Sequence, residues 1–334
     1  MPKVSVIIVN YNGKDLITSC LKALEEQVFR DFEVVVVDNA SSDSSLHEIQ
    51  KFVESSTLAP LIKLIPLSKN SGFSGGNLVG LKYAEGEYIA LLNNDAVPDK
   101  KWIEEFVKAM NSDPTVGICA SKIIVYGTDI IDSAGDGFSS FLKGFKRGEG
   151  EKALLYDKSS YIFGACAGAA FYRRKMLEET GFFDEDFFLI QEDTDLNFRA
   201  QLAGWKVLYV PAAIVHHKVR SSIGHMSNMA VFYTLRNTEF VIIKNVPFFV
   251  ILRRLPGYIV RTMTDFIYFA LKHKHLRVYF KAKIDVLRML PKMLKKRKYI
   301  IKNKKVKNSY LLSIITAIWQ RDFLMAKIKK LLYG

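Results

Sequence analysis

The sequence predicts an α/β fold: a Rossmann-like, mostly parallel central sheet flanked by helices, followed by a basic helical appendage. Three observations lead to this prediction. Over the first hundred residues, apolar runs alternate with segments whose apolar residues have helical spacing. Polar side chains directly follow two of these runs, and basic residues accumulate after residue 240. We therefore expect a sheet domain over residues 1–240 and a basic amphipathic helical region over 241–334.

The predicted strands of the first hundred residues are apolar at nearly every position, as expected for strands that helices cover on both faces. They run from Val4 to Val9, Phe32 to Val37, Leu61 to Leu67 and Tyr88 to Leu92. Helical spacing or capping residues mark the segments between them, at 15–27, 41–52 and 74–84. This alternating order predicts a parallel sheet with right-handed crossovers.

The second hundred residues are mixed in pattern. Residues 116–125 and 161–172 have the composition of strands, and residues 191–203 have that of a helix. A further strand over 205–210 is expected to stop at Pro211, which cannot donate to a sheet ladder.

Charge and cysteine usage narrow the class of protein. The net charge is +14, but residues 241–334 alone contain 23 lysines and arginines against 3 aspartates and glutamates. Cys20, Cys119 and Cys166 are far apart, so we expect neither a zinc site nor a disulfide framework and infer a reducing compartment. The first apolar run is too short for a signal peptide.

Two carboxylates directly follow buried strands. Asp38 and Asp95 sit where ligands bind in parallel sheets, beyond the carboxyl ends of the strands. Asp38 can accept hydrogen bonds from a ribose or a base, and Asp95, after Asn93 and Asn94, can hold Mg²⁺ or Mn²⁺. The alternatives are a helix cap at Asp38 and a polar turn leading to Pro98.

Residues 70–77 form a glycine-rich turn that opens a predicted helix. Such a turn lets backbone N–H groups approach a phosphate, although the spacing matches neither a Walker loop nor a dinucleotide fingerprint. A plain turn is the alternative.

Three carboxylates, Glu192, Asp193 and Asp195, open the helix predicted at 191–203. Asp195 is expected to pair with Arg199 one turn later, which leaves Glu192 and Asp193 to face a pocket mouth. A carboxylate beside a sugar hydroxyl is a competent general base. An acidic helix N-terminus without a catalytic role is the alternative.

A histidine pair, His216-His217, follows the last predicted strand and Pro211 and could contact a metal, although such pairs are more often structural. The residues that follow could grip a diphosphate, and the run to Ser227 resembles a mobile lid. The gripping residues are Lys218, Arg220, Ser221 and Ser222.

Taken together, these segments resemble glycosyltransferase family 2, and the later ones resemble its rhamnosyltransferase-like branch. The resemblance spans roughly residues 3–240 in one order. It is carried by residues 4–12, 37–43, 70–80, 92–95, 181–185, 192–196, 204–205 and 211–217. Two positions depart from the family pattern, since Asn93 replaces the first Asp of Asp-x-Asp and Leu78 replaces a second Asn.

The resemblance implies a GT-A fold, a nucleotide-sugar donor, a divalent metal (Mn²⁺ or Mg²⁺) and an inverting single displacement. It implies Asp193 as the catalytic base with Glu192 beside it, and Asp95 and His217 as metal ligands, with His216 the less favoured of the pair. The implied donor-binding residues are Asn10, Tyr11, Asn12, Asp38, Asn70, Gly72, Gly76, Asn94 and Asp95. The donor would be dTDP-rhamnose or a UDP-sugar, and the acceptor a glycan or a lipid-linked saccharide.

The tail mixes apolar and basic residues, and no uncharged stretch reaches the ~18–20 residues that span a bilayer. Helices of this composition lie in the interface of anionic membranes, so we expect a cytoplasmic protein that is peripheral on the inner face. The expected aromatic anchors are Phe248, Phe249, Tyr258, Phe266, Tyr268, Phe269 and Trp319. A solvated bundle or an oligomer contact is the alternative; nothing before residue 240 requires nucleic acid.

Two other functions compete with sugar transfer. One is a catalytically inert nucleotide-sugar sensor or scaffold, against which the paired carboxylates beside a metal motif argue. The other is a nucleotidyltransferase, which would need a basic glycine-rich loop after the first strand, where the chain has Asn10-Tyr11-Asn12-Gly13.

Overall fold

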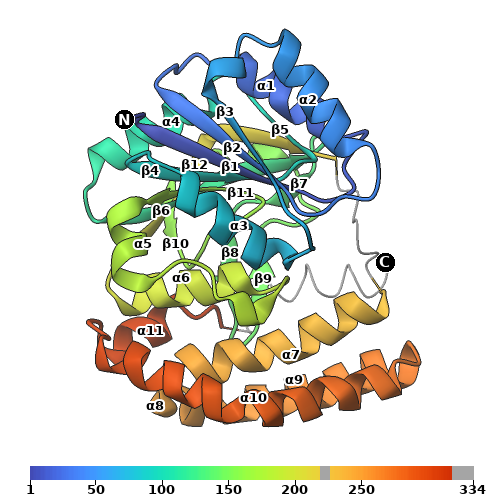
Figure 1. Ribbon diagram of the computed structural model, residues 1–334. Coiled ribbons are helices and arrows are strands. Elements are labelled where there is room, and N and C mark those ends of the chain that lie inside the picture. The colour runs from blue at the N-terminus through green and yellow to red at the C-terminus, as the bar shows by residue number, and fades with distance from the viewer. Residues whose placement is uncertain (219–225, 318–334) are drawn as a thin grey trace.

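A ten-stranded sheet forms the centre of the computed structural model, which describes residues 1–218 and 226–317 (Figure 1). Its main strand order is β10-β12-β6-β11-β4-β1-β2-β3, with β5 paired to β12 and β7 to β6. The bounds are β1 Val4–Asn10, β2 Phe32–Asp38, β3 Ile62–Pro66, β4 Tyr88–Leu92, β5 Ala96–Pro98, β6 Val116–Val125, β7 Ile131–Ser133, β10 Ser160–Ile162, β11 Ala169–Arg173 and β12 Lys206–His217.

Strands β1 to β4 pair in parallel, as the sequence predicted. Asn10 lies opposite Asp38 in the register of β1 and β2, so both polar residues reach the same edge of the sheet. The strand β4 ends nearby at Leu92, which places Asn93, Asn94 and Asp95 along this carboxyl edge.

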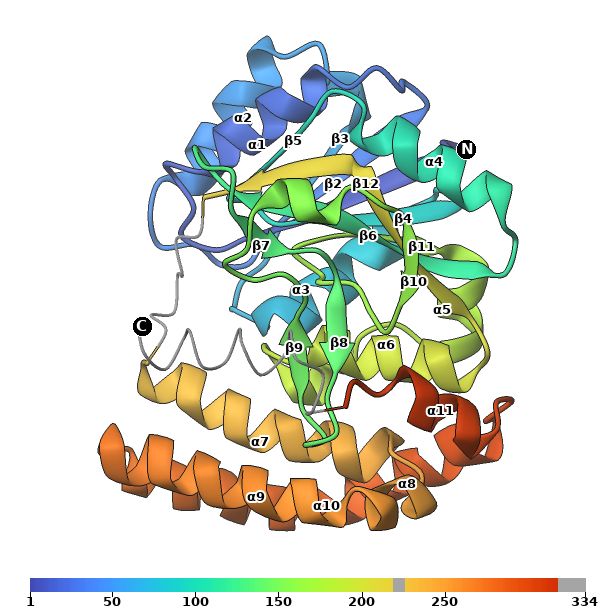
Figure 2. The same ribbon diagram turned by 180° about the vertical axis from the view of Figure 1, so that it is seen from behind.

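Helices cover both faces of the sheet. One core cluster packs α1, α2 and α4 on the first face, and a second packs α3, α5 and α6 on the other (Figures 1 and 2). These helices are α1 Ile17–Glu25, α2 Ser45–Ser55, α3 Gly72–Tyr83, α4 Trp102–Ser112, α5 Arg174–Thr180 and α6 Glu192–Leu202. Burial of the strands on both faces explains their continuous apolar runs.

Two strand predictions were wrong. Residues 161–172 do not form one strand, because a loop at 163–168 separates β10 from β11, which pair with different neighbours. Pro211 does not end the last strand: β12 continues through it to His217. The register of β12 against β6 shifts between Val210 and Ile214, so the ladder is interrupted where proline lacks a donor.

A small hairpin, β8 Asp136–Phe138 with β9 Gly144–Lys146, lies outside the main sheet. Its strands place Asp136 opposite Lys146. This hairpin extends toward the C-terminal helices in Figure 2.

The C-terminal helices form layers beyond α6 (Figure 2). They are α7 Asn228–Asn245, α8 Phe248–Arg253, α9 Leu255–Asp265, the π-helix η4 Phe266–Lys272, α10 Leu276–Lys302 and α11 Asn308–Ile314. The boundary expected at residue 240 falls inside α7, while the sheet ends at His217 and α7 starts at Asn228. The division of the chain into two domains stays a prediction. Within the described residues, every helix lacks the combined length and hydropathy of a membrane-crossing segment.

Several residues with predicted roles lie outside the described part of the chain. They are Arg220, Ser221 and Ser222, most of the proposed lid, and the anchor Trp319.

Candidate active site

His217 joins two carboxylates at the carboxyl edge of the sheet. Its Nε2 lies 3.0 Å from Oδ1 of Asp95, and its Nδ1 lies 3.0 Å from Oδ2 of Asp132. Asp132 in β7 also accepts a hydrogen bond of 2.7 Å from Lys146 Nζ. The Nε2 atom of the neighbouring His216 lies 3.3 Å from Oδ1 of Asp99, so the two histidines contact different carboxylates.

The electrostatics of this group follow from its pairing. Burial lowers the pKa of His217, but the hydrogen bonds to Asp132 and Asp95 outweigh burial and raise it to about 9. Burial raises the pKa of Asp132, and the contacts with His217 and Lys146 reverse that effect and bring it to about 2. Asp132 is therefore ionised and orients the imidazole.

The ligand atoms that Asp95 and His217 offer fit a divalent cation such as Mn²⁺. A carboxylate oxygen and an imidazole nitrogen face one another, and the other imidazole nitrogen is held by a carboxylate, as is usual for metal-binding histidines. With two protein ligands, further coordination positions stay open for diphosphate oxygens and water.

Asn10 connects the ends of three parallel strands. Its Nδ2 donates to Asp38 Oδ1 at 3.0 Å, and its Oδ1 accepts from Asn94 Nδ2 at 2.8 Å. Gly13 is required beside this link, because a Cβ there would lie 2.1 Å from Asn94 Nδ2. The residues predicted from the ends of β1, β2 and β4 are thus brought together.

Asp38 is only 2% exposed, and protein donors occupy its carboxylate. Oδ1 accepts from Asn10 and, at 2.6 Å, from Ser41 Oγ, while Oδ2 accepts from the Ser41 amide at 3.2 Å. The exposed groups of this region are Tyr11 and Asn12. Asp38 therefore shapes the loop from inside, and Tyr11 and Asn12 present the accessible surface.

The two glycines expected beside a nucleotide have packing roles, and their contact with a nucleotide stays a prediction. Gly72 has φ +73°, and a Cβ there would lie 2.4 Å from the carbonyl oxygen of Phe188. Gly76 faces β1, where a Cβ would lie 2.7 Å from Val9. Of the predicted residues in this turn, Asn70 is the exposed one, and its Oδ1 accepts from the Gly72 amide at 2.8 Å.

Asp193 lies in the first turn of α6. Its Oδ1 accepts from the Thr194 amide at 2.6 Å, and Oδ2 accepts from the Ala167 amide at 3.4 Å. The neighbouring Gly168 carbonyl accepts from the Asn93 amide at 2.8 Å. The loop at 163–168 therefore bonds to the Asn93-Asn94-Asp95 segment through Gly168 and to Asp193 through Ala167.

Asp136 and Cys166 surround Asp193. One polar atom from each of the three residues lies within 4.8 Å of the others. Burial and the charge of Asp193 raise the pKa of Asp136 well above its usual range, so Asp136 keeps its proton and Asp193 is left ionised. Burial raises the pKa of Asp193 more moderately, which makes it a stronger base than an exposed carboxylate.

Glu192 does not face the pocket mouth, which corrects the expectation from sequence. It is 6% exposed, and its Oε2 has no hydrogen-bond partner in the described structure. Burial, reinforced by the charge of Asp193, raises the pKa of Glu192 to about 8. A carboxyl group that is protonated at neutral pH cannot act as a base there.

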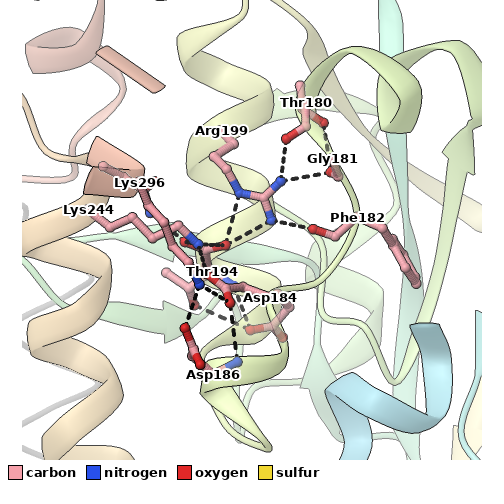
Figure 3. Close-up of polar contacts among 12 residues, drawn as sticks. Thr180, Gly181, Phe182, Asp184, Asp186, Thr194, Arg199, Lys244 and Lys296 are labelled. Atoms are coloured by element: carbon pink, nitrogen blue, oxygen red, sulfur yellow. Dashed lines mark hydrogen bonds and ion pairs between the residues drawn. The ribbon is translucent and has the colours of Figure 1, made fainter. Parts of the chain in front are cut away.

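Asp195 anchors α6 to the C-terminal helices. Figure 3 shows Lys244, Lys296 and Arg199 gathered in this region, near Asp184. It pairs with Arg199 at 2.8 Å, as predicted, and with Lys244 of α7 at 2.9 Å. Lys244 also pairs with Asp184 at 2.6 Å, and Lys296 of α10 reaches Asp184 at the same distance. The third carboxylate of the motif is therefore structural, and it fixes the helix that carries Asp193.

Sequence reasoning missed Asp132, Asp136 and Lys146. They lie on short strands of two different sheets, with no flanking pattern that distinguishes them from surface residues. A search for a carboxylate partner of His217 was the available signal, because metal-binding histidines usually have one.

Comparisons with known proteins add to this geometry. The sequence profile described as Glycosyl transferase family 2 matches residues 5–181. An uncharacterized glycosyltransferase of Nostoc sp. is 28% identical over 228 residues, which cover 67% of each chain. The poly(ribitol-phosphate) beta-N-acetylglucosaminyltransferase TarS of Staphylococcus aureus is 27% identical over 231 residues, covering 68% of this chain and 37% of TarS.

Two solved structures share the fold. A crystal structure of S. aureus TarS has a TM-score of 0.57 at 18% identity, covering 90% of this chain and 88% of that one. The mannosyltransferase PcManGT from Pyrobaculum calidifontis, in complex with GDP-Man and Mn²⁺, has a TM-score of 0.55 at 19% identity, covering 99% and 87%. Both likenesses support a mixed α/β architecture with a curled sheet and C-terminal helices.

Proposed function

This chain belongs to glycosyltransferase family 2 and has the GT-A fold, and on that premise we propose that it is an inverting, metal-dependent enzyme. It transfers a sugar from a nucleoside-diphosphate donor to a hydroxyl group of a glycan or a lipid-linked acceptor. The observation that carries the proposal is the connected arrangement of Asp95, His217 and Asp193 at one edge of the sheet.

The reaction is a single displacement. Asp193 takes the proton of the acceptor hydroxyl, the acceptor oxygen bonds to the anomeric carbon, and the bond from that carbon to the diphosphate breaks with inversion. The amides of Thr194 and Ala167 hold the carboxylate of Asp193 in one orientation. The half-buried position raises the pKa of Asp193 and strengthens it as a base.

Asp95 and His217 would hold the divalent metal. When bound, Mn²⁺ or Mg²⁺ offsets the negative charge that develops on the leaving diphosphate. Asp132 keeps Nδ1 of His217 occupied, so Nε2 is the nitrogen directed at Asp95. Lys146 in turn holds Asp132, so the ligand geometry is set by a chain of charged partners.

Donor binding is proposed at the exposed residues of the same edge. Tyr11 and Asn12 offer a ring face and an amide, Asn70 is exposed, and Asn94 is partly exposed. Asn10, Asp38, Gly72 and Gly76 support these loops from inside.

The proposal also concerns which nucleotide sugar is the donor. The resemblance to the rhamnosyltransferase-like branch favours dTDP-rhamnose, whereas TarS has been solved with UDP-GlcNAc and PcManGT with GDP-Man. A thermal-shift panel of nucleoside diphosphates and their sugars, with and without Mn²⁺, discriminates among them. The proposed donor raises the melting temperature more than its competitors do.

Slow hydrolysis of the donor distinguishes an enzyme from an inert nucleotide-sugar-binding scaffold. The wild-type chain with Mn²⁺ should release free sugar from its donor, and Asp95→Asn should not. Donor binding without any hydrolysis or transfer, over a panel of acceptors, would favour the scaffold.

A further inference from the structure

The helix α9 is polar on its inner side and apolar on its outer side. Arg261 is 3% exposed and pairs with Glu239 at 3.0 Å and with Asp265 at 3.1 Å. Ile259 and Met263 on the outer side are 49% and 60% exposed. This is the reverse of a surface helix in water, which buries its apolar stripe and exposes its charges.

The apolar outer side continues along the neighbouring helices. Exposed apolar residues follow one another at intervals of three or four from α8 through α9 to η4, and within α9 this spacing places them on one face. They are Phe248, Leu252, Leu255, Ile259, Met263, Ile267 and Leu271. Of the expected aromatic anchors, Tyr258, Phe266 and Phe269 are instead partly buried against the core.

A second exposed stripe runs along α10. This helix buries Tyr279, Ala282, Val286 and Met293. On its other side it exposes Leu276, Phe280, Ile284, Leu287 and Leu294, again at intervals of three, four or seven. The helix is therefore apolar on two sides. Packing within the described structure covers the first side and leaves the second exposed.

Both stripes belong to the outermost layer of the molecule. Figures 1 and 2 show α9 and α10 farther from the sheet than α7, on the side opposite α1 and α2. We call the exposed apolar residues of α8, α9, η4 and α10 named above the outer apolar face. Exposed apolar side chains gathered on the surface of a protein mark interaction sites.

Cationic side chains border the outer apolar face. A groove of about 470 Å³ between α7 and α10 combines Phe280 and Ile284 with Arg277, Lys281 and Arg288. The one carboxylate among its described lining residues, Asp285, pairs with Arg236 of α7 at 3.2 Å. The side chains of Arg277 and Arg288 have neither an ion pair nor a hydrogen bond to any other described residue. Apolar side chains flanked by free cations match the composition of a helix that lies in the interface of an anionic membrane.

We propose that the outer apolar face docks onto the surface of an anionic lipid bilayer, with its apolar side chains in the acyl boundary and Arg277 and Arg288 at the headgroups. A second copy of this chain fits the face less well. A symmetric contact would bring the same unpaired cations together, whereas anionic headgroups neutralise them. The inner, cytoplasmic leaflet is the anionic surface that such basic helices meet in cells.

Docking would fix the orientation of the candidate active site. Lys244 and Lys296 tie α7 and α10 to Asp184 and Asp195, next to the helix that carries Asp193. These ion pairs join the outer layer to the region of the catalytic helix. A fixed orientation suits an acceptor held at a membrane, and this consequence rests on the proposed transfer activity. The docking proposal does not depend on that activity.

Vesicle flotation of the full chain, without donor or acceptor, tests the proposal. Vesicles of phosphatidylcholine with about one third phosphatidylglycerol should carry the wild-type protein to the top of the gradient. The triple variant Ile259→Ser/Met263→Ser/Ile267→Ser should bind at least about tenfold more weakly, because it removes apolar area from the inserted face. A matched control is Leu154→Ser/Leu155→Ser, which changes two residues of comparable exposure, 64% and 65%, in another part of the chain.

Charge reversal supplies an independent arm. Arg277→Glu/Arg288→Glu should weaken binding to anionic vesicles by at least roughly fivefold per residue, and should have little effect on binding to pure phosphatidylcholine. Circular dichroism verifies that each variant is folded. Equal flotation of wild type and triple variant would overturn the proposal. So would a wild-type dimer in analytical ultracentrifugation that the triple variant abolishes, combined with no vesicle binding.

Discussion

The imidazole of His217 is held by Asp132, with Nδ1 and Oδ2 3.0 Å apart, while its other nitrogen lies 3.0 Å from Asp95. Asp132 comes 85 residues before His217 in the chain, and β7 and β12 both pair with β6. This contact decides which nitrogen meets Asp95, so it links a residue without an evident motif to the proposed chemistry.

The variant Asp132→Asn is expected to weaken Mn²⁺ binding by about 10–100-fold, because partners of metal-binding histidines set ring orientation and basicity. Isothermal titration with Mn²⁺ and the Mn²⁺ dependence of activity both measure this. The exposed Asp129→Asn, three residues earlier in the chain, is the control and should bind as the wild type does. Unchanged affinity in Asp132→Asn would remove Asp132 from the site.

Chelation is expected to stop the enzyme. EDTA should abolish sugar transfer and donor hydrolysis, and added Mn²⁺ or Mg²⁺ should restore both, because Asp95 and His217 are proposed to hold the ion. In Asp95→Asn, excess metal should not restore activity. Full turnover in EDTA would take Asp95 and His217 out of a metal role.

Metal affinity is expected to depend on pH. In the metal-free protein the pKa of His217 is raised to about 9, so at neutral pH Nε2 carries a proton that a metal must displace. Mn²⁺ affinity should therefore fall by roughly tenfold for each pH unit below 9. Titrations between about pH 6.5 and 8.5 test this, and His217→Gln should give a flatter profile.

The same shift has a consequence for stability without metal. The folded-state pKa of His217 lies above its ordinary value of 6.5, so the stabilisation is fully present below pH 6.5. It should be lost as the pH rises through about 9. Urea unfolding of the EDTA-treated protein and of His217→Gln measures this difference.

The sheet and the carboxyl edge could be predicted from sequence because parallel strands buried on both faces leave continuous apolar runs. Such runs suffice to place Asp38 and Asp95 at that edge. The sequence also shows Glu192, Asp193 and Asp195 as a group, but it does not show the separate role of each. Those roles depend on contacts with residues distant in sequence, such as Ala167 and Lys244. The pattern therefore could not show that Asp195 is structural and Glu192 protonated.

The helical tail illustrates a second limit. Its composition indicates amphipathic helices, but periodicity alone does not say which side faces inward. Besides Asp265 of α9 itself, Arg261 pairs with the buried Glu239, which lies on the other side of the boundary expected at residue 240. This long-range pairing identifies the polar side of α9 as the inner one.

Removal of Lys244 is expected to destabilise the fold. Lys244→Met removes the buried cation that Asp184 and Asp195 share, although Lys296 still pairs with Asp184 and Arg199 with Asp195. Breaking a buried pair costs up to about 3–5 kcal/mol. The control Lys108→Met removes an exposed helix ion pair with Glu104 and Glu105 and should cost at most about 1 kcal/mol. Denaturant unfolding measures both, and equal losses would mean that the Lys244 network does not brace α6.

The most direct test of the account compares Asp193→Asn with Glu192→Gln. Asp193→Asn should lower kcat by about 10²–10⁴-fold, because it removes the proton acceptor, while the affinity for the donor nucleotide in calorimetry stays at the wild-type value. Glu192→Gln should keep kcat within a few-fold at neutral pH, because the pKa of Glu192 near 8 means that the wild-type side chain is already neutral. Near wild-type turnover in Asp193→Asn would contradict the assignment of Asp193 as the base.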